Sequence, residues 1–355
     1  MKISNIKNVC VIDSMYTLLQ YLLMQTIDDI EHTFFFWSDG ISEEVRLKFK
    51  GSSAYIDIHR TKKNAQKSQN ILNRILFYLR PLAYFIKYPI KWPFILDDKI
   101  RYYGVDHLKY SQNILRKHKF ELLEDGTLNY FKNNSFPSYS PKQKKILNFL
   151  YGNQFSQKTE YAGDESTCSK IHLTGLLPLP NDYPQKVEIE SLLDLWNRCN
   201  SKKKTYINEI YKLDLASLQK LKVCNKILMT RPFSEDNVMS ENEKIELYKR
   251  FIRKIGCDGL LIKKHPRERT DYSQFFPNVV VMNQSVPMQL LTFNGIKFEE
   301  AYAICTTSIL DFPYHIRIGY IGSEIDYRIE KKLPNMKTCN VSFEGKDIEL
   351  INIKI

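Results

Sequence analysis

The stretch "CNKILMTRPFSEDNVMSENEKIELYKRFIRKIGCDGLLIKKHP", residues 224–266, contains the alternation that decides the fold. Its first part, "CNKILMTRP", predicts a strand followed by a loop. The segment "SENEKIELYKRFIRKIG" predicts a helix, with Ser240 or Glu241 near its start and Gly256 just past its end. "DGLLIKKHP" then predicts a strand that ends at Pro266. Strand, helix and strand in this order are typical of parallel strands joined by a crossover helix.

The same alternation continues on both sides of this stretch. Toward the C-terminus, "NVVVMNQS" predicts a strand, "VPMQLLTFNG" a short helix, and "FEEAYAICTTSIL" an apolar strand with a Thr/Ser turn. Near the N-terminus, "NVCVID" predicts a strand, "SMYTLLQYLLMQTI" a helix and "HTFFFWSDG" a strand. "KIRYYGVD" and "KFELLEDG" predict further strands of that sheet, and they bracket a helix over 106–118. The pattern indicates an α/β protein with two Rossmann-like halves.

Domain bounds follow from a polar, basic break, "NRCNSKKKTY", at residues 197–206. We expect an N-terminal domain over 1–205, a linker region over 206–222 with a helical pattern from residue 207 to residue 221, and a C-terminal domain over 223–355. A last helix that crosses back to the first domain is left open.

The composition of the chain is globular and basic. Of its 355 residues 43% are hydrophobic, and the formal net charge is +12. A positive surface attracts nucleic acid, acidic lipid, or phosphorylated and sugar-acid substrates, and charge alone does not choose among them. A basic nucleic-acid-binding protein is the non-enzymatic alternative, although the charge is spread along the chain and no nucleic-acid-binding motif is visible.

Cysteine usage and hydropathy bear on the compartment. The seven cysteines form no CxxC pair, which predicts free thiols in a reducing compartment, with a disulfide framework or a zinc site as the alternative. The N-terminus does not resemble a signal peptide, and no run reaches about 18 uninterrupted apolar residues. We therefore expect a cytoplasmic protein. Residues 71–96 are apolar, aromatic and basic, so they predict either a peripheral contact with the inner membrane or core helices. The oligomeric state, a homodimer included, stays open.

Glu124, Asp125 and Gly126 follow the predicted strand "FELL" directly. Glycine allows a tight turn and the close approach of a ligand, and an aspartate held there could accept a proton from a hydroxyl group. The alternative is a polar turn that merely closes the strand.

His265 follows another predicted strand, within the basic stretch "KKHPRER" of residues 263–269. A histidine among cationic side chains suits an anionic phosphate, to which it can donate a hydrogen bond or a proton. The alternative is a solvated basic loop.

Three hydroxyl groups follow a third predicted strand, at Thr306, Thr307 and Ser308. A helix that started there would favour a phosphate, whereas an ordinary helix cap is the alternative. The sequence has no P-loop and no GxGxxG motif. Because it has no dense Asp/Glu/His cluster and no DxD triplet, no metal requirement is predicted.

Taken in order, these stretches resemble the motifs of bacterial sialyltransferases of the GT-B kind. They are "LLEDGTLNY" (122–130), "LLIKKHPRE" (260–268) and "CTTSI" (305–309). The chain is most similar to glycosyltransferase family 52, which includes lipooligosaccharide sialyltransferases. "YTLLQ" (16–20) and the D-G-T-x-N run (125–129) also fit that family. The likeness covers most of the chain in order and spacing.

The resemblance implies a GT-B fold, in which two Rossmann-like domains face a central cleft. It implies CMP-sialic acid as donor and an inverting transfer, without metal or other cofactor, to a galactose-type hydroxyl of a capsule or lipooligosaccharide glycan.

The resemblance also implies roles for individual residues. Asp125 would be the general base, with Glu124 as its motif neighbour and Glu235 and Asp236 as second candidates. His265 would stabilise or protonate the departing CMP phosphate. The residues expected to bind the donor are Arg231, Lys264, Pro266, Pro287, Met288, Gln289, Thr306, Thr307 and Ser308. Those expected on the acceptor side are Tyr16, Thr17, Gly126 and Thr127.

Gln289 departs from the family pattern, because relatives place a glutamate of a Pro-x-Glu segment against the cytidine ribose. Glutamine can still hydrogen-bond a ribose hydroxyl. The departure leaves open a GT-B enzyme that uses a UDP-sugar donor.

Overall fold

Two separate parallel sheets organise the chain. The computed structural model describes residues 6–38, 40–55, 99–107, 111, 115, 118–132, 141, 145, 160–341, 343 and 345–353. The first structural unit comprises Met1–Gly175 and Leu179–Leu195, and the second comprises Leu176–Pro178 and Trp196–Ile355.

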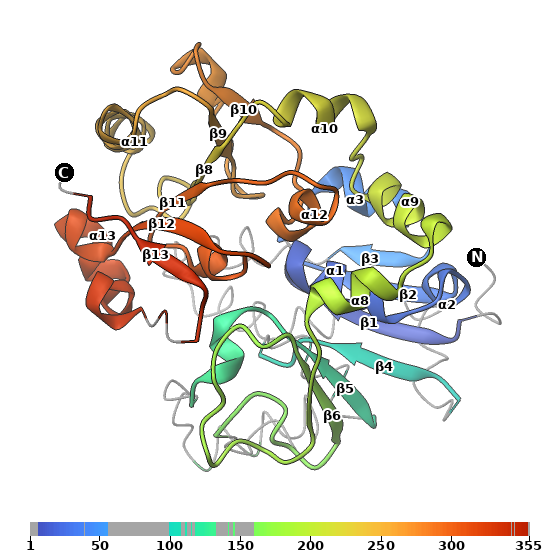
Figure 1. Ribbon diagram of the computed structural model, residues 1–355. Helices are drawn as coiled ribbons and strands as arrows, with labels where there is room; N and C mark the ends of the chain where they lie inside the picture. Colours follow the sequence, from blue (N-terminus) through green and yellow to red (C-terminus); the bar gives the residue numbers. More distant parts are fainter. Residues whose placement is uncertain are drawn as a thin grey trace, which may run out of the picture. The chain divides into compact units, whose positions relative to one another are not determined.

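The sheet of the first unit has its described strands in the order β3-β2-β1-β4-β5-β6-β7, all parallel (Figure 1). These strands are β1 (Asn8–Ile12), β2 (Thr33–Trp37), β3 (Ser53–Tyr55), β4 (Arg101–Gly104), β5 (Phe120–Leu123), β6 (Cys168–Leu173) and β7 (Val187–Ile189). The described helices are α1 (Met15–Met24), α2 (Ile27–Glu31), α3 (Glu43–Lys48) and the 3-10 helix η4 (Thr127–Tyr130). The strand order reverses between β1 and β4, and in such sheets ligands bind beyond the carboxyl ends of the strands at this reversal.

The sheet of the second unit repeats this winding, with the order β10-β9-β8-β11-β12-β13, again parallel. Its strands are β8 (Lys226–Met229), β9 (Leu260–Lys263), β10 (Val280–Met282), β11 (Glu300–Ile304), β12 (Ile316–Ile321) and β13 (Ile348–Leu350). The α-helices are α8 (Leu192–Arg198), which spans the boundary between the units, α9 (Ser201–Ile210), α10 (Leu215–Leu221), α11 (Glu241–Ile255), α12 (Met288–Phe293) and α13 (Tyr327–Lys332). The 3-10 helices are η5 (Tyr272–Gln274), η6 (Thr307–Leu310), η7 (Ser323–Ile325), η8 (Pro334–Met336) and η9 (Thr338–Asn340).

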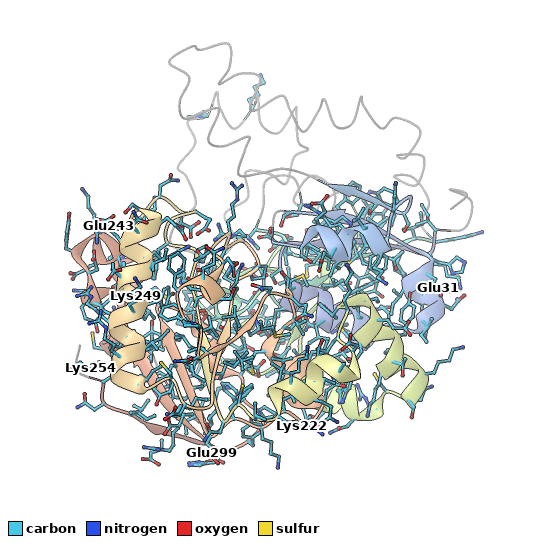
Figure 2. The ribbon with its side chains drawn as sticks, turned by 90° about the horizontal axis from the view of Figure 1, so that it is seen from above. Glu31, Lys222, Glu243, Lys249, Lys254 and Glu299 are labelled. Atoms are coloured by element: carbon cyan, nitrogen blue, oxygen red, sulfur yellow. The ribbon has the colours of Figure 1, made fainter. Side chains whose placement is uncertain are left out.

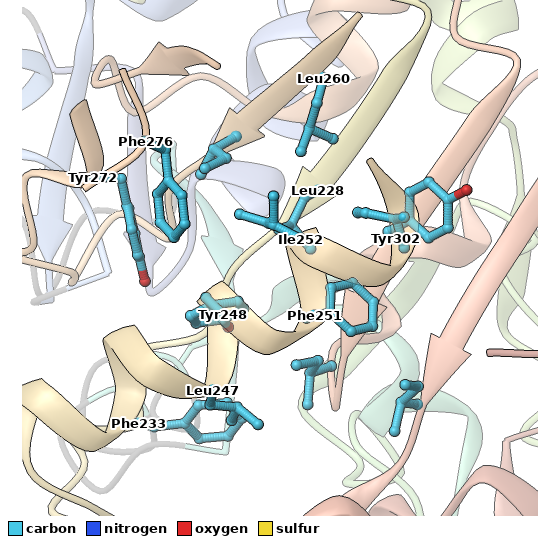
Figure 3. Packing of buried hydrophobic residues seen from close by; sticks show 14 of the residues in the cluster. Leu228, Phe233, Leu247, Tyr248, Phe251, Ile252, Leu260, Tyr272, Phe276 and Tyr302 are labelled. Carbon is cyan, nitrogen blue, oxygen red and sulfur yellow. The ribbon is translucent and has the colours of Figure 1, made fainter. Parts of the chain in front are cut away.

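Helix α11 shows why these sequences form these elements. Ser240 caps its first turn and forms a capping box with Glu243, and Gly256 ends it with a φ of 81°. One face of the helix, including Tyr248 and Phe251, packs on the sheet of the second unit (Figure 3). The opposite face carries charged residues such as Lys249 (Figure 2). Apolar burial of this kind contributes about 25 cal/mol per Å².

The prediction of an α/β chain with alternating strands and helices is confirmed. The polar break predicted at 197–206 is wrong, because residues 201–210 form α9, which Asn200 caps by accepting a hydrogen bond from the Lys203 N–H. Lysines are good helix formers, and Ile207 and Ile210 give α9 a buried side. The strands β3, β6, β7, β12 and β13 and the helix α13 were not predicted.

The structure tests some of the remaining sequence predictions and leaves others outside the described residues. Residues 71–96 and most of the predicted helix over 106–118 lie outside the described residues, although Ser111 and Leu115 are helical. Helix α13 and β13 belong to the second unit. All seven cysteines are free thiols, as predicted. Within the described ranges, no helix has the length and apolar character needed to cross a membrane.

Candidate active site

Gly126 lets the chain turn sharply after β5. Its φ of 82° and ψ of −158° lie in a region that residues with a Cβ avoid. A Cβ built there would meet no atom within 4 Å, so the requirement for glycine is conformational. The turn leads into η4 and leaves Asp125 and Thr127 only half-buried.

Glu124 is the buried anchor of this turn. Its side chain is fully buried, and its Oε2 accepts hydrogen bonds from Tyr130 Oη (3.0 Å), Thr174 N (2.5 Å) and Thr174 Oγ1 (3.0 Å). Tyr16 Oη lies 3.4 Å from its Oε1 and 2.6 Å from Thr174 Oγ1. A carboxylate with these donors is satisfied in place and holds the loop.

Asp125 is held from the start of α1. Thr17 Oγ1 lies 2.9 Å from Asp125 Oδ1 and 2.9 Å from Glu124 O, and the Asp125 N–H donates to Asn129 Oδ1 at 2.8 Å. The structure therefore brings Tyr16 and Thr17, two of the residues expected on the acceptor side, against the loop that begins at Glu124.

Asp125 belongs to an Asp–His–Asp cluster. Its other two members, Asp13 and His107, were not predicted from the sequence. His107 Nε2 lies 3.5 Å from Asp13 Oδ2 and 3.5 Å from Asp125 Oδ2. Partial burial alone would lower the pKa of His107, but the carboxylates of Asp13 and Asp125, together with that of Asp106, raise it to about 9. Burial and the charge of Asp13 raise the pKa of Asp125, against the opposing effect of His107. An imidazolium thus lies between two carboxylates.

This cluster is also where a cation could be held. The ligand atoms of Asp13, His107 and Asp125 lie within 4.8 Å of one another, and carboxylates with an imidazole are a common metal-ligand set. A metal would have to displace the proton of His107. The signal for the cluster was present in the sequence. Asp13 and His107 closely follow two predicted strands, β1 and β4, that lie on either side of the strand-order reversal.

His265 lies two residues beyond β9 and is half-buried. Its backbone N–H donates to Glu268 Oε2 at 2.8 Å, and its Nδ1 accepts from the Arg267 N–H at 3.2 Å. The neutral ring therefore carries its proton on Nε2. Burial lowers the pKa of His265 well below its usual value, as do the charges of Arg267, Lys263 and Arg231. This histidine is a neutral hydrogen-bond donor in a cationic setting.

Two further cations lie in this setting. Arg231 follows β8, and its guanidinium donates to the Cys305 carbonyl after β11. Lys263 ends β9, where its backbone carbonyl accepts from the Thr230 N–H at 3.2 Å, and its ammonium has no hydrogen-bond or salt-bridge partner among the described residues. Burial lowers its pKa to about 8. The sequence reading named Lys264 and Pro266 as donor-binding residues, and both are half-buried beside it.

The hydroxyl groups of residues 306–308 lie beyond β11, the neighbour of β8. Thr306 Oγ1 lies 3.1 Å from Ser308 Oγ, and Ser308 Oγ lies 3.3 Å from Met229 Sδ at the end of β8. Thr307 begins η6, a four-residue 3-10 helix. Binding here would depend on the hydroxyl groups, because the element is too short to supply a helix dipole.

The segment that contains Gln289, which differs from the glutamate of the family pattern, begins α12. Pro287 occupies the N-cap position without a side-chain hydrogen bond, and Met288 and Gln289 are buried. Gln289 Nε2 donates to Asp311 Oδ2 at 2.6 Å. Burial raises the pKa of Asp311. The Gln289 amide therefore already has a carboxylate partner.

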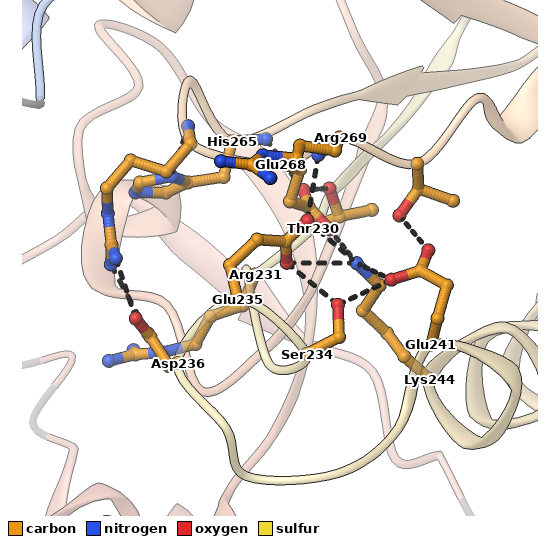
Figure 4. A network of polar contacts seen from close by, with 12 residues as sticks. Thr230, Arg231, Ser234, Glu235, Asp236, Glu241, Lys244, His265, Glu268 and Arg269 are labelled. Atoms are coloured by element: carbon orange, nitrogen blue, oxygen red, sulfur yellow. Dashed lines mark hydrogen bonds and ion pairs between the residues drawn. The ribbon is translucent and has the colours of Figure 1, made fainter. Parts of the chain in front are cut away.

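Glu235 and Asp236, the second candidates for the base, are both paired within the second unit (Figure 4). Glu235 accepts from Lys244 Nζ at 3.1 Å and from the Arg269 N–H at 2.8 Å. Asp236 forms a bidentate pair with Arg267, at 2.6 and 3.2 Å.

Most of the chain is similar in sequence to a known protein family. The sequence model of glycosyltransferase family 52 matches residues 59–321. An uncharacterised protein of Haemophilus influenzae is 34% identical over 249 residues, which cover 69% of this chain and 77% of that protein.

Solved bacterial sialyltransferases share the fold. An α/β-galactoside α-2,3-sialyltransferase of Photobacterium phosphoreum has a TM-score of 0.53 at 14% identity, with 97% of each chain covered. A 2,6-sialyltransferase of Photobacterium sp. JT-ISH-224, solved with CMP and lactose, has a TM-score of 0.51 at 12% identity, covering 97% of this chain and 78% of that one. The GT-B domain of a Photobacterium damselae sialyltransferase has a TM-score of 0.51 at 13% identity, covering 97% and 99%. The expected GT-B fold is confirmed.

Proposed function

Because the chain belongs to glycosyltransferase family 52, we propose that it transfers sialic acid from CMP-sialic acid to a galactose-type hydroxyl of a cell-surface glycan. Membership of the family makes the protein a glycosyltransferase. The choice of sialic acid is supported by the fold shared with the Photobacterium sialyltransferases, one of which was solved with CMP and lactose.

One observation carries the proposal. Each unit presents a proton-transfer group beyond the carboxyl ends of its strands, and the two groups have opposite surroundings. Asp125 is a carboxylate whose pKa is raised, and His265 is a neutral imidazole among cations. This is the division of labour that a transfer between an acceptor hydroxyl and a phosphate leaving group requires.

We assign Asp125 as the general base for the acceptor. A raised pKa makes its carboxylate a stronger proton acceptor, and Thr17 and Asn129 fix its position. His107 beside it retains its own proton at neutral pH, so it supplies charge rather than basicity. In a single displacement, the acceptor oxygen attacks the anomeric carbon as its proton passes to Asp125, the bond from that carbon to the phosphate oxygen of CMP breaks, and the configuration inverts.

We assign the second unit to the donor nucleotide. The Nε2–H of His265 would donate to a phosphate oxygen of the departing CMP, with Lys263 and the hydroxyl groups of residues 306–308 as further contacts. Positive charge and hydrogen-bond donors fixed before the reaction stabilise the developing charge of the leaving group. We therefore propose transfer without a metal. A cation held by Asp13, His107 and Asp125 would supply Lewis-acid chemistry instead.

The test is the release of CMP from CMP-sialic acid, with lactose as acceptor and EDTA present, by the wild type and by Asp125→Asn. We expect metal-independent turnover by the wild type and a loss of about 10²- to 10⁴-fold in kcat for the variant, which should still bind CMP. Asp164→Asn is the control, because Asp164 is an exposed carboxylate of the same unit.

Two results would contradict the proposal. The first is a wild type that neither turns over CMP-sialic acid nor gains thermal stability with CMP. In that case the hypothesis of a UDP-sugar donor replaces that of a CMP-sialic acid donor, and UDP-sugars are assayed in the same way. If EDTA abolishes turnover and Mg²⁺ restores it, the metal-independent mechanism is wrong.

A further inference from the structure

We propose that Lys244, a buried lysine of α11, positions the candidate leaving-group histidine, His265, through the acidic residues around it. Lys244 is a positioning residue in this proposal, since it acts through its neighbours and not on the substrate. The kinetic part of the proposal rests on the function proposed above, whereas the geometric part does not.

Lys244 is a buried ammonium at the centre of a network of charged side chains (Figure 4). Its side chain is 0% exposed, and its Nζ lies 3.1 Å from Glu235, 3.2 Å from Glu241 and 3.6 Å from Glu268. A fully buried lysine is rare unless it is paired, and here one ammonium faces three carboxylates. The ammonium of Lys244 is therefore the shared counter-ion of the three carboxylates.

Each of the three carboxylates also binds residues 265–270, the segment that carries His265. Glu268 Oε2 accepts the His265 N–H at 2.8 Å, and Glu235 Oε1 accepts the Arg269 N–H at 2.8 Å. Glu241 Oε1 accepts the Thr270 hydroxyl. Lys244 of α11 thus contacts three carboxylates that hold this segment: Glu268 from within the segment, Glu235 from the loop after β8, and Glu241 from α11 itself.

These attachments also determine the orientation of the imidazole. The Arg267 N–H donates to His265 Nδ1, so the tautomer depends on where the backbone of residue 267 lies. Glu268 receives two more hydrogen bonds, from the Thr230 hydroxyl and from Tyr272 Oη at 2.7 Å. Thr230 follows β8, so the network reaches from α11 across the ends of β8 and β9.

Removal of the ammonium would change this arrangement in a definite way. Burial raises the pKa of Glu268, and Lys244 is one of the groups that oppose the increase. Without Lys244, the carboxylates repel one another and Glu268 takes up a proton more readily. The His265 N–H then loses a charged acceptor, and residues 265–270 lose a fixed position.

The kinetic experiment compares Lys244→Met with Lys249→Met. Lys249 is the matched control, because it lies on the solvent-facing side of α11, where its ammonium pairs with Glu246 at 2.8 Å and lies 5.8 Å from the centre of the Phe275 ring, and, among the described residues, it does not contact the Lys244 network. We expect Lys244→Met to lower kcat by about 100-fold with the KM for CMP-sialic acid unchanged, since a small misplacement of a catalytic group has an effect of this size. Its pH profile of kcat should shift, whereas Lys249→Met should match the wild type in every respect.

Substitutions at Glu268 keep the proposal testable if Lys244→Met does not fold. Glu268→Gln retains a carbonyl oxygen for the His265 N–H, and Glu268→Ala does not. We expect activity to fall in the order wild type, Glu268→Gln, Glu268→Ala. Wild-type kcat in Glu268→Ala, or wild-type kcat and pH profile in folded Lys244→Met, would overturn the proposal.

A second measurement does not depend on turnover. The ring nitrogen signals of His265 in an NMR spectrum, assigned with His265→Gln, report its tautomer and pKa. We expect the Nε2–H tautomer in the wild type and a change of tautomer or pKa in Glu268→Ala. If CMP-sialic acid is not a substrate but these signals change, the proposed function fails and the positioning role stands. Unchanged signals in Glu268→Ala refute the positioning role.

Discussion

His107 and His265 follow strands at the same edge of their respective sheets, yet their surroundings give them opposite charges. His107 lies between Asp13 and Asp125, and its pKa is raised to about 9. His265 is surrounded by Arg267, Lys263 and Arg231, and its pKa falls well below 6.5. One ring is an imidazolium at neutral pH, and the other is a neutral donor.

The difference teaches that the neighbours of a histidine, and not its place in the fold, decide which part it can take in a reaction. An imidazolium held between carboxylates is a counter-ion, and its proton is hard to remove. A neutral imidazole among cations gains affinity for a proton as soon as an anionic phosphate reaches it. The two units therefore offer different chemistry from the same residue type.

The largest expected effect is on enzymatic activity, and it distinguishes His265 from His107. His265→Gln should lower kcat/KM for CMP-sialic acid by about 10²- to 10⁴-fold, because the departing phosphate loses its donor. His107→Gln should cost about 10-fold or less, because it removes a neighbouring charge and not a proton-transfer group. Steady-state kinetics of both variants decides the order, and a larger loss for His107→Gln would reverse the assignment.

The next effect compares two glycines with positive φ, one in each unit. Gly126 has a φ of 82° and Gly295 a φ of 85°, and an added Cβ would meet nothing within 4 Å at either position. Alanine should therefore lower the free energy of unfolding through backbone strain alone, by about 1–3 kcal/mol in both variants. Only Gly126→Ala should also reduce kcat, because it displaces Asp125. Urea unfolding and turnover of both variants test this, and equal kcat values would argue against a catalytic loop at Gly126.

The smallest effect is the pH dependence of stability. The folded pKa of His107 exceeds its unfolded value of about 6.5, so its stabilising contribution is complete below that pH and is lost as the pH rises through about 9. Since about a third of its side chain is exposed, we expect this contribution to be on the order of 1 kcal/mol. His265, with a lowered pKa, has the opposite sign and favours unfolding as the pH falls below 6.5.

Urea unfolding between pH 6 and pH 10 measures this contribution in the wild type and in His107→Gln. The free energies of unfolding should differ most near pH 6 and converge above pH 9. A difference that is constant with pH would mean that His107 does not hold its proton.

Local signals explain which elements could be predicted from the sequence. The apolar runs of β1 and β2 and the cap residues of α11 specify those elements within a few residues. Strand β6, "CSKIHL", mixes polar and apolar residues, and β7 has three residues at the edge of its sheet. Neither carries a signal stronger than that of an ordinary loop.

The candidate site divides in the same way. Asp125 and His265 were predicted because each belongs to a short motif. Asp13 and His107 were missed because they lie 94 positions apart in the sequence, and only the strand order places their neighbouring strands side by side. Lys244 was missed because a lysine in a charged helix looks solvated until tertiary packing shows it to be buried.

The network around Lys244 has a consequence for how homologous sequences can diverge. A substitution of Lys244 alone would leave the buried Glu268, the half-buried Glu235 and the more exposed Glu241 without this counter-ion, and a return to stability would then require changes at one or more of these positions as well. We therefore expect these four positions to covary among homologues, so that substitutions in α11 accompany substitutions in residues 265–270. Lys249, on the outer side of the same helix, should vary independently of them.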